Sequence, residues 1–401
     1  MTLQADDTPI VIVGAGIAGL TAALALAADN HNVIILERTG ELAEVGAGLQ
    51  LSPNACRVLQ SVGVFDLVAS NAVAPESVRI RSGRTGADLA RLPLGAKILK
   101  RHGTPYFVIH RADLQKALIS RVLETPNIDL WLSSEVQDVQ EAPSNGLRCF
   151  FEKAREPGEL TAKALIGADG VWSQTRRFIP GHKAAQFTGK TAYRTTIPAG
   201  MVDWQLMLDT GLWLGPNAHL VHYPVRDGAQ FNLVALVDER WTEETWSAPT
   251  DGADMQRNFT KWAAQPRALL DIPRNWTKWA LCGVDASGPW TNGRIALIGD
   301  AAHAMLPFVA QGAAMGIEDA AVLAACLKPG TSETIPSALN SYEGQRRGRV
   351  KSVQDMAATN ARIYHLSGAP AFARDTALRL MPSRKLLSRV DWIYGWRPPG
   401  G

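Results

Sequence analysis

The sequence is poor in the features that build metal sites, disulfide scaffolds and membrane spans. Its 401 residues include four cysteines, which lie far apart, without a CxxC pair and without histidines at zinc-ligand spacing: Cys56, Cys149, Cys282 and Cys326. This pattern argues against a disulfide-stapled fold and predicts no metal site. No uninterrupted run of about 18 apolar residues is present to cross a bilayer. No lysine or arginine precedes Arg38, so the apolar N-terminus lacks the basic start of a signal peptide. We therefore expect a cytoplasmic protein.

The sequence also has little excess of charge of one sign. Its net charge is +3, which is too small to indicate nucleic-acid binding. The charge is uneven, however. The segment from Ser341 onward holds eleven Lys or Arg and four Asp or Glu, a net of +7, which leaves −4 on the first 340 residues. A solvated helical face explains such a bias, and steering of an anionic substrate or cofactor is the functional alternative. A monomer and a homodimer are both compatible with this segment.

The strongest local pattern is TPIVIVGAGIAGLTAALALAADNHNVIILER. An apolar run leads into Gly14-x-Gly16-x-x-Gly19, an alanine-rich stretch follows, and a second apolar run ends in Glu37. This order predicts a strand, a tight turn, a helix and a second strand, the unit that holds a dinucleotide. The glycines let the backbone approach a pyrophosphate at the helix N-terminus, and the acid binds a ribose hydroxyl. Glu37 disfavours a 2′-phosphate, but the motif alone does not choose between NAD and FAD.

Two further stretches favour FAD. GADGVWSQTRR places Asp169, and GDAAHAMLP places Asp300, at the end of an apolar run. A carboxylate there is costly unless a polar group meets it, and a ribityl chain and a second phosphate are suitable partners. The helix expected from Gly312 would direct its N-terminus at a flavin and stabilise negative charge on the reduced ring. Each stretch alone can be an ordinary strand end and helix cap, but three in this order favour a flavin site.

The remaining chain supplies elements between these motifs. Residues of about 76 to 104 are strand-like, HRADLQKALISRVLE has helical spacing, and alternation around Val136 and Cys149 predicts a hairpin-like insertion. Several strands are expected from Phe187 to Val237, and the last sixty residues read as mainly helical. No second GxGxxG is present. One dinucleotide is therefore held, and a nicotinamide cofactor, if used, visits briefly.

With these motifs in order, the sequence resembles the single-component, class A FAD-dependent aromatic hydroxylases, in particular the salicylate hydroxylase and 3-hydroxybenzoate 6-hydroxylase branch. VGAGLQLSPNA, HRADL, GPNAHLVHYPV, AQGAAMGIEDAA, YEGQRRGRV and DWIYGW have counterparts there. The resemblance implies an α/β fold with an α+β insertion: a Rossmann-like FAD-binding domain, an inserted antiparallel substrate-domain sheet and a helical C-terminus, as in p-hydroxybenzoate hydroxylase. The expected FAD-binding domain comprises residues 1–75, 105–180 and 281–350, the substrate-binding domain 76–104 and 181–280, and the C-terminal helical region 351–401.

The implied activity is that of a flavin-dependent monooxygenase in aromatic compound catabolism. NADH or NADPH, as a transient co-substrate, would reduce tightly but non-covalently bound FAD. Oxygen would then form a C4a-hydroperoxide that hydroxylates a small phenolic or aromatic acid. A FAD oxidase or dehydrogenase without NAD(P)H use is an alternative, and a catalytically silent nucleotide-binding scaffold is another. Retention of all three flavin motifs argues against the scaffold.

The resemblance also implies cofactor-binding roles. Glu37 would hold the adenosine ribose, Arg38 would lie near the phosphates, Arg111 would reach the ribityl or pyrophosphate region, and Gln50 would lie beside the flavin ring. Val136 would contact the adenine. The full expected set is Gly14, Gly16, Ile17, Ala18, Gly19, Glu37, Arg38, Gly48, Gln50, Arg111, Val136, Asp169, Asp300, Gly312 and Ala313.

The candidate catalytic residues lie in GPNAHLVHYPV. Side chains alternate along a strand, so His219 and Tyr223 share one face while His222 takes the other. We expect His219 to be a base or a substrate-orienting donor with Tyr223 beside it, the alternative being a hydrogen-bonded core histidine. We further expect Pro307, Phe308 and Trp213 to line the substrate pocket.

The chain departs from its resemblance in two places. Gln50 stands where the 6-hydroxynicotinate enzymes carry a histidine, which disfavours that substrate. GVDASGPW lacks the arginine that relatives place before the proline in a loop bordering the flavin. Because Arg and Lys are plentiful, we expect an aromatic acid with a hydroxyl or amino group as substrate, although the sequence identifies no specific carboxylate-binding residue.

Overall fold

The first strand, turn, helix and strand form as the sequence predicts. In the computed structural model, which describes residues 8–42, 47–143, 145–328 and 334–400, strand β1 (Ile10–Val13) leads into helix α1 (Ile17–Ala28) and strand β2 (Val33–Leu36). β1 pairs in parallel with β2 on one side and with β11 (Ala164–Gly167) on the other. The apolar run of β1 is nearly continuous because a central parallel strand is covered on both faces.

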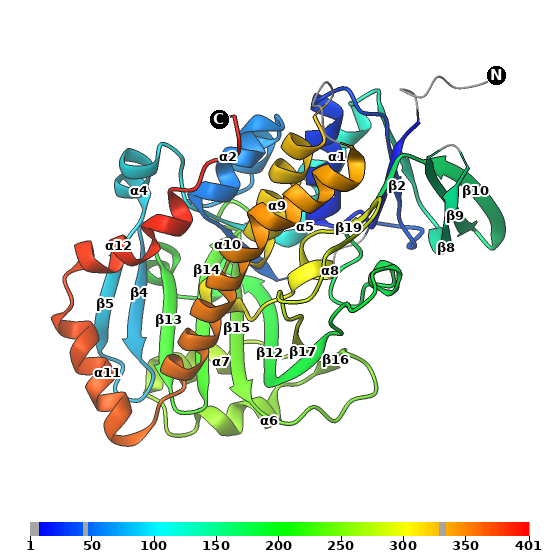
Figure 1. The fold of residues 1–401 in the computed structure, drawn as a ribbon. Coiled ribbons are helices and arrows are strands. Elements are labelled where there is room, and N and C mark those ends of the chain that lie inside the picture. Colours follow the sequence, from blue (N-terminus) through cyan, green and yellow to red (C-terminus); the bar gives the residue numbers. More distant parts are fainter. Residues whose placement is uncertain (1–7, 43–46, 144, 329–333, 401) are drawn as a thin grey trace.

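These strands belong to a six-stranded sheet in the order β18-β19-β11-β1-β2-β7. Its pairs are parallel except at the edge, where β18 runs antiparallel to β19. Figure 1 shows α1, α5 and α9 gathered beside this sheet, while a separate three-stranded sheet lies at its outer end. The elements not yet bounded are α5 (Arg111–Leu123), α9 (Gly312–Cys326), β7 (Ile128–Trp131), β8 (Ser134–Ala142), β9 (Gly146–Lys153), β10 (Glu156–Ala162), β18 (Thr291–Asn292) and β19 (Ile295–Leu297).

A second, eight-stranded sheet has the order β16-β17-β12-β15-β14-β13-β4-β5. Its pairs are antiparallel apart from β13 and β4, which run in parallel. Its strands are β4 (Ser77–Ser82), β5 (Asp88–Pro93), β12 (Gln186–Pro198), β13 (Thr210–Gly215), β14 (Ala218–Val225), β15 (Gln230–Asp238), β16 (Ser247–Thr250) and β17 (Trp276–Gly283). A short pair, β3 (Gly48–Leu51) with β6 (Phe107–His110), connects the two regions.

One stretch corrects the expectation of strands from 76 to 104. The last part forms helix α4 (Gly95–His102). A glycine with positive φ stands at each end of this helix: φ is +48° at Gly95 and +79° at Gly103. Three basic residues in the last turn interact favourably with the negative C-terminal end of the helix dipole. Strand propensity of neighbouring residues does not override these signals.

The C-terminal segment is helical, as predicted, and α10 is its longest element. The remaining helices are α2 (Pro53–Ser61), α3 (Phe65–Ala69), α6 (Ala253–Gln256), α7 (Ala264–Asp271), α8 (Asp300–His303), α10 (Ile335–Tyr364), α11 (Gly368–Leu380) and α12 (Ser383–Tyr394). α10 continues without a break through the expected boundary at residue 350. It begins near β19, where Tyr342 Oη donates to Leu297 O over 3.0 Å, and ends beside β14 and β15. α10 therefore links the two sheets (Figure 1).

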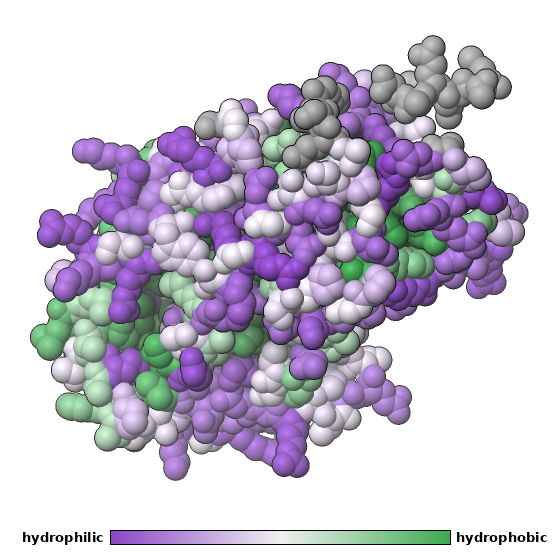
Figure 2. All heavy atoms as spheres, viewed as in Figure 1, coloured by the Kyte–Doolittle hydropathy of each residue, from purple (hydrophilic) through white to green (hydrophobic). Residues whose placement is uncertain are grey.

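The visible surface is mixed, with apolar residues gathered over α11 (Figure 2). Phe372 and Leu380 of this helix are 73% and 77% exposed. None of the helices in the described ranges is long and apolar enough to cross a membrane. Whether the protein is a monomer or a homodimer stays a prediction.

Candidate functional site

A cavity of about 290 Å³ lies between the two sheets. One wall comes from α1, the β11 end, the Asp300 loop and the start of α9, and the opposite wall comes from β12, β14 and β15. The structure therefore brings together, on one cavity, residues spread from position 16 to position 316. The sequence-predicted residues that line it are Gly16, Ile17, Ala18, Gly48, Gln50, Arg111, His219, Tyr223, Asp300, Pro307, Gly312 and Ala313.

The three glycines of the first motif have different physical tasks. Gly14 has a φ of +102°, and a Cβ added there would lie 2.7 Å from Ala168 O, so the turn excludes a side chain. A Cβ on Gly19 would lie 2.1 Å from Gly14 O, so this position allows close helix packing. A Cβ on Gly16 would meet no atom within 4 Å, because it faces the cavity. Only Gly16 of the three lines the space a ligand would enter.

Two helix N-termini open onto this cavity. Neither Gly16, which precedes α1, nor Gln311, which precedes α9, gives its helix a side-chain cap. A Cβ on Gly312 would again meet no atom within 4 Å. The first N–H groups of both helices thus remain available to an anionic ligand, and the helix dipoles favour one.

The Asp300 carboxylate is an acceptor without a protein donor. It is exposed toward the cavity, and in the described ranges its side chain makes no hydrogen bond. Behind it, Asp319 Oδ2 accepts from Gly299 N over 2.8 Å and contacts His303 Nε2 at 2.6 Å. His303 therefore supports the loop from a buried position instead of lining the cavity, while Asp300 stays free for ligand hydroxyls.

Asp169 takes a different position from Asp300. Its Oδ2 accepts from Gln174 N over 2.8 Å and from Thr175 N over 2.9 Å, which caps the 3-10 helix η1 (Thr175–Phe178). Oδ1 is buried and has no partner among the described residues. Its neighbours Ala168 and Gly170 line the cavity, but Asp169 does not. Oδ2 therefore acts as a helix cap, which was the structural alternative, while Oδ1 stays available to a ligand.

Glu37 lies beyond the cavity, at the end of β2. Its Oε2 accepts from Ala15 N over 2.8 Å, so the carboxylate is fixed against the glycine-rich turn. Ser134 N donates to Glu37 O over 2.8 Å, which places the start of β8, and with it buried Val136, beside this end. Arg38 is exposed. Glu37 and Val136 thus lie at the same end of β2, outside the residues that line the cavity.

The alternation predicted along β14 is correct. His219, Val221 and Tyr223 line the cavity, whereas His222 is buried on the opposite face. Trp213, expected in the substrate pocket, needs correction. It pairs with Leu220 across β13 and β14. Leu220 and His222 share the face of the sheet that points away from the cavity, so Trp213 is fully buried in the core on that side.

Phe308 also lies outside the lining, although Pro307 is part of it. Its ring packs against His219 with centroids 4.8 Å apart, and it is 4% exposed. The 3-10 turn that begins at Pro307 directs successive side chains differently, so Phe308 supports the histidine from behind. This corrects its expected contact with substrate.

Burial shifts the pKa values of the two candidate catalytic groups in opposite directions, and both shifts favour the neutral side chain. Burial lowers the pKa of His219 well below its usual value, and His365 and Lys190 lower it further. His219 is therefore neutral and has a lone pair to accept a proton. Burial raises the pKa of Tyr223, so it keeps its hydroxyl proton and acts as a hydrogen-bond donor. Tyr223 contacts Gln50, whose Oε1 also accepts from Tyr106 Oη.

Arg194 is the functional candidate that the sequence did not reveal. It comes from β12, lines the cavity beside His219 and Tyr223, and makes no hydrogen bond or ion pair in the described part of the chain. Burial lowers the pKa of its guanidinium, Tyr223 raises it and Arg111 lowers it further. The sequence signal that could have indicated Arg194 was an arginine within AYRTTI, a stretch with strand propensity. This signal is weak, because many strand arginines point to solvent.

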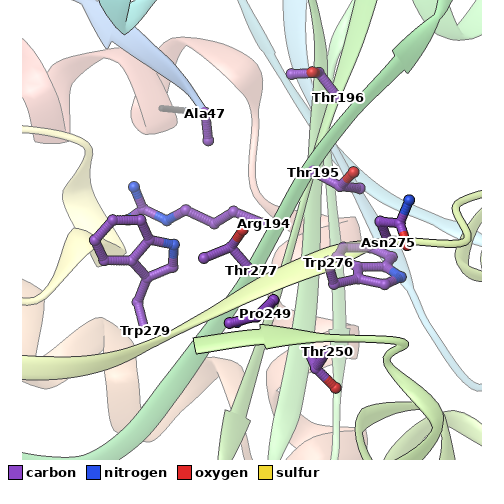
Figure 3. Close-up of a pocket in the computed structure, with 10 residues that line it drawn as sticks. All are labelled: Ala47, Arg194, Thr195, Thr196, Pro249, Thr250, Asn275, Trp276, Thr277 and Trp279. Atoms are coloured by element: carbon purple, nitrogen blue, oxygen red, sulfur yellow. The ribbon is translucent and has the colours of Figure 1, made fainter. Parts of the chain in front are cut away.

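Arg194 also lines a second, larger hollow of about 610 Å³ with Ala47, Thr277 and Trp279 (Figure 3). It pairs with Thr277 across β12 and β17. None of the three nucleotide motifs contributes to this hollow, so the smaller cavity is the candidate active site. Arg194 is shared by both spaces.

His365 and Asp238 were also missed. His365, at the end of α10, contacts His219 Nδ1 through its Nε2 at 2.8 Å, and its Nδ1 contacts Asp238 Oδ1 at 2.9 Å. Since 146 residues separate the two histidines, no spacing in the sequence could link them.

Comparison with known proteins agrees with this geometry. A family model described as FAD binding domain matches residues 7–357. The chain is 34% identical over 389 residues to 3-hydroxybenzoate 6-hydroxylase 1 of Aquipseudomonas alcaligenes, covering 96% of this chain and 97% of that protein. It is 33% identical over 401 residues to 3-amino-4-hydroxybenzoate 2-monooxygenase PtmB3 of Streptomyces platensis, covering 99% of this chain and 98% of that protein.

The fold has a close solved counterpart. A salicylate hydroxylase substrate complex superimposes with a TM-score of 0.81 at 28% identity, covering 98% of this chain and 97% of the other. The predicted fold class and the resemblance to flavin-dependent aromatic hydroxylases are thereby confirmed. The glycine turn, the uncapped helix ends and the free Asp300 carboxylate fit the cofactor of that group. The chain belongs to the FAD-binding monooxygenase family.

Proposed function

We propose that this protein hydroxylates a phenolic aromatic acid, using FAD, O2 and NADH or NADPH. The Arg194 guanidinium, unpaired on the cavity wall within the described chain, is the main reason to propose an acid as the substrate. Arg194 is half-buried and its Nε is fully buried. Burying part of a cation without a counter-charge is costly, and a substrate carboxylate would reduce that cost. Substrates named for the relatives, 3-hydroxybenzoate, 3-amino-4-hydroxybenzoate and salicylate, are all aromatic acids with a hydroxyl group, which supports the same class.

The cofactor residues would act along the whole length of the bound FAD. The N–H groups after Gly16 would meet the pyrophosphate, Glu37 the adenosine ribose and Asp300 the ribityl hydroxyls. The amides of Gly312 and Ala313 would lie at the ring, where the α9 dipole favours negative charge. The chemistry that bound FAD would supply there, after reduction by NAD(P)H, is activation of oxygen for transfer to an aromatic carbon.

The substrate residues would place and activate the ring. Arg194 would bind the carboxylate, Tyr223 would donate a hydrogen bond, and His219 would accept the proton of the hydroxyl group. Losing that proton makes the ring more electron-rich, which favours attack by electrophilic oxygen. Val221, Val234 and Leu236 give the same wall an apolar surface that excludes water.

Arg194→Met tests the assignment of an acid. We expect kcat/KM for 3-hydroxybenzoate to fall by about 100-fold, because the charge pair with the substrate carboxylate is lost. Activity with 3-hydroxybenzamide, which keeps the ring and hydroxyl but has no charge, should change much less. FAD content should remain that of the wild type. Arg79→Met, which removes an arginine from the surface pair with Asp88, is the matched control and should leave both activities unchanged.

Three results would contradict the proposal. An equal loss of activity with the acid and the amide would show that Arg194 does not bind the substrate carboxylate. Loss of FAD from Arg194→Met would assign the arginine to the cofactor instead. Substrate oxidation without any NAD(P)H consumption by the wild type would favour an FAD oxidase or dehydrogenase.

A further inference from the structure

We propose that His365 and Asp238 form, with His219, a hydrogen-bonded relay that carries the substrate's hydroxyl proton from the cavity to the protein surface. The inference rests on the proposed function, in which His219 accepts that proton. His365 and Asp238 touch neither substrate nor cofactor in this account, so both are positioning residues.

The relay has the geometry of a path out of the cavity. His219 lines the cavity and is 2% exposed, His365 is 7% exposed, and the Asp238 side chain is 35% exposed. The two links measure 2.8 Å from His219 Nδ1 to His365 Nε2 and 2.9 Å from His365 Nδ1 to Asp238 Oδ1. Both lengths suit strong hydrogen bonds. A continuous chain thus joins the catalytic wall to solvent.

The carboxylate at the outer end fixes both histidine tautomers. Burial alone would raise the pKa of Asp238, but hydrogen bonds from His365 and Lys190 bring it below its usual value, so Asp238 is ionised and only accepts. The Nδ1 of His365 must then carry the hydrogen, which leaves its Nε2 as an acceptor. His219 consequently donates from Nδ1, and its Nε2 presents a lone pair. Within the described chain this Nε2 makes no hydrogen bond.

Each transfer along the relay conserves one proton. The substrate hydroxyl gives its proton to His219 Nε2, and His219 passes the proton on its Nδ1 to His365 Nε2. His365 then releases the proton on its Nδ1 to Asp238 or to water at the surface. The substrate is left as phenolate, one proton has entered solvent, and rotation of neither ring is needed until the chain resets.

The surrounding charges favour passing the proton outward. Lys190 Nζ pairs with Asp238, and both Lys190 and Arg374 lower the pKa of His365, although burial is the largest cause. His219 faces His365, Lys190 and the ring of Tyr364, without a carboxylate of its own. A positive charge on either histidine is therefore unstable, while the carboxylate attracts the proton at the outer end.

His365→Phe tests the relay, because it keeps an aromatic ring in the same packing and removes both nitrogens. With 3-hydroxybenzoate we expect kcat near neutral pH to fall by about 10- to 100-fold with KM little changed. The deficit should shrink as pH rises toward about 10, where a phenol ionises in solution without a base. Tyr364→Phe, the adjacent aromatic residue, should keep the wild-type pH profile. A loss of equal size at every pH would overturn the relay, since it would indicate altered packing alone.

A second measurement judges the relay without turnover. Nitrogen-15 NMR of histidine-labelled, FAD-loaded protein should show His219 and His365 neutral, each with its hydrogen on Nδ1. Asp238→Ala should abolish this preference in both rings. A hydrogen on His219 Nε2 in the wild type would overturn the relay whatever the substrate is. Wild-type protein that hydroxylates no phenolic acid would instead defeat the proposed function, and the tautomers would then decide the relay alone.

Discussion

Replacing Arg346 with methionine should destabilise the protein severely, because it removes the centre of a buried ion cluster. Arg346 is 1% exposed and lies 2.7 Å from Glu318 and 2.7 Å from Asp319, both of which are fully buried. Arg349 also binds Glu318, whereas among the described residues Asp319 would keep His303 and a backbone N–H as partners. Breaking a buried pair by removing one partner costs about 3–5 kcal/mol. We expect a loss of this size near neutral pH.

The loss should depend on pH in a defined direction. Burial alone would raise the pKa of Asp319, but His303 and Arg346 lower it to about 2. A lowered acid pKa stabilises the folded state above the unfolded value of about 3.9, and this contribution is lost as pH falls toward 2. Without Arg346 the pKa of Asp319 should rise, so protonation in mild acid relieves the unpaired charge. The difference between variant and wild type should therefore be largest near neutral pH and narrow below about pH 4.

Urea unfolding of the FAD-loaded proteins, followed by far-UV circular dichroism, measures this difference. Lys351→Met is the matched control, because Lys351 lies on the same helix in an exposed pair with Asp355 and should cost less than about 0.5 kcal/mol. Equal stability of Arg346→Met and the control would show that the buried ion cluster does not stabilise the fold. A deficit that does not change with pH would show that lost packing, and not charge, destabilises the variant.

Two further substitutions test the site. Gly16→Ala adds a Cβ that meets no protein atom within 4 Å, so the FAD-free protein should keep its stability while FAD affinity falls by about tenfold or more; equilibrium dialysis measures this, with Gly200→Ala, equally unobstructed, as control. Unchanged FAD affinity would place the pyrophosphate elsewhere. Trp213→Phe should lower the free energy of unfolding by about 1–3 kcal/mol with KM unaltered, because its ring packs in the far core. A raised KM with unchanged stability would restore Trp213 to the substrate pocket.

The nucleotide-binding half was predictable because its signals are local. The turn glycines, the helix starts and strand-end Asp300 depend on residues adjacent in sequence, so composition and spacing locate them. The face of β14 was predictable for the same reason, since alternation in an extended strand fixes which side chains point together. These elements follow from backbone geometry.

The missed features depend on contacts between distant segments. His365 meets His219 only because α10 runs from the parallel sheet to the ends of β14 and β15. Trp213 was misplaced because its face depends on the register of β13 against β14, which no local pattern specifies. The basic C-terminal segment was expected to be a solvated face, yet Arg346 is buried against acids of α9. Pairing across the fold decided each of these cases.

The central claim is that bound FAD activates oxygen for insertion into a phenolic acid. The most direct measurement supplies the purified, FAD-loaded protein with NADH or NADPH, a panel of hydroxybenzoates and oxygen-18 gas, and analyses the product by mass spectrometry. We expect an aromatic product that gains one labelled oxygen atom for each NAD(P)H consumed. An oxidised product without label, or NAD(P)H consumption that yields only hydrogen peroxide with every acid tested, would contradict it.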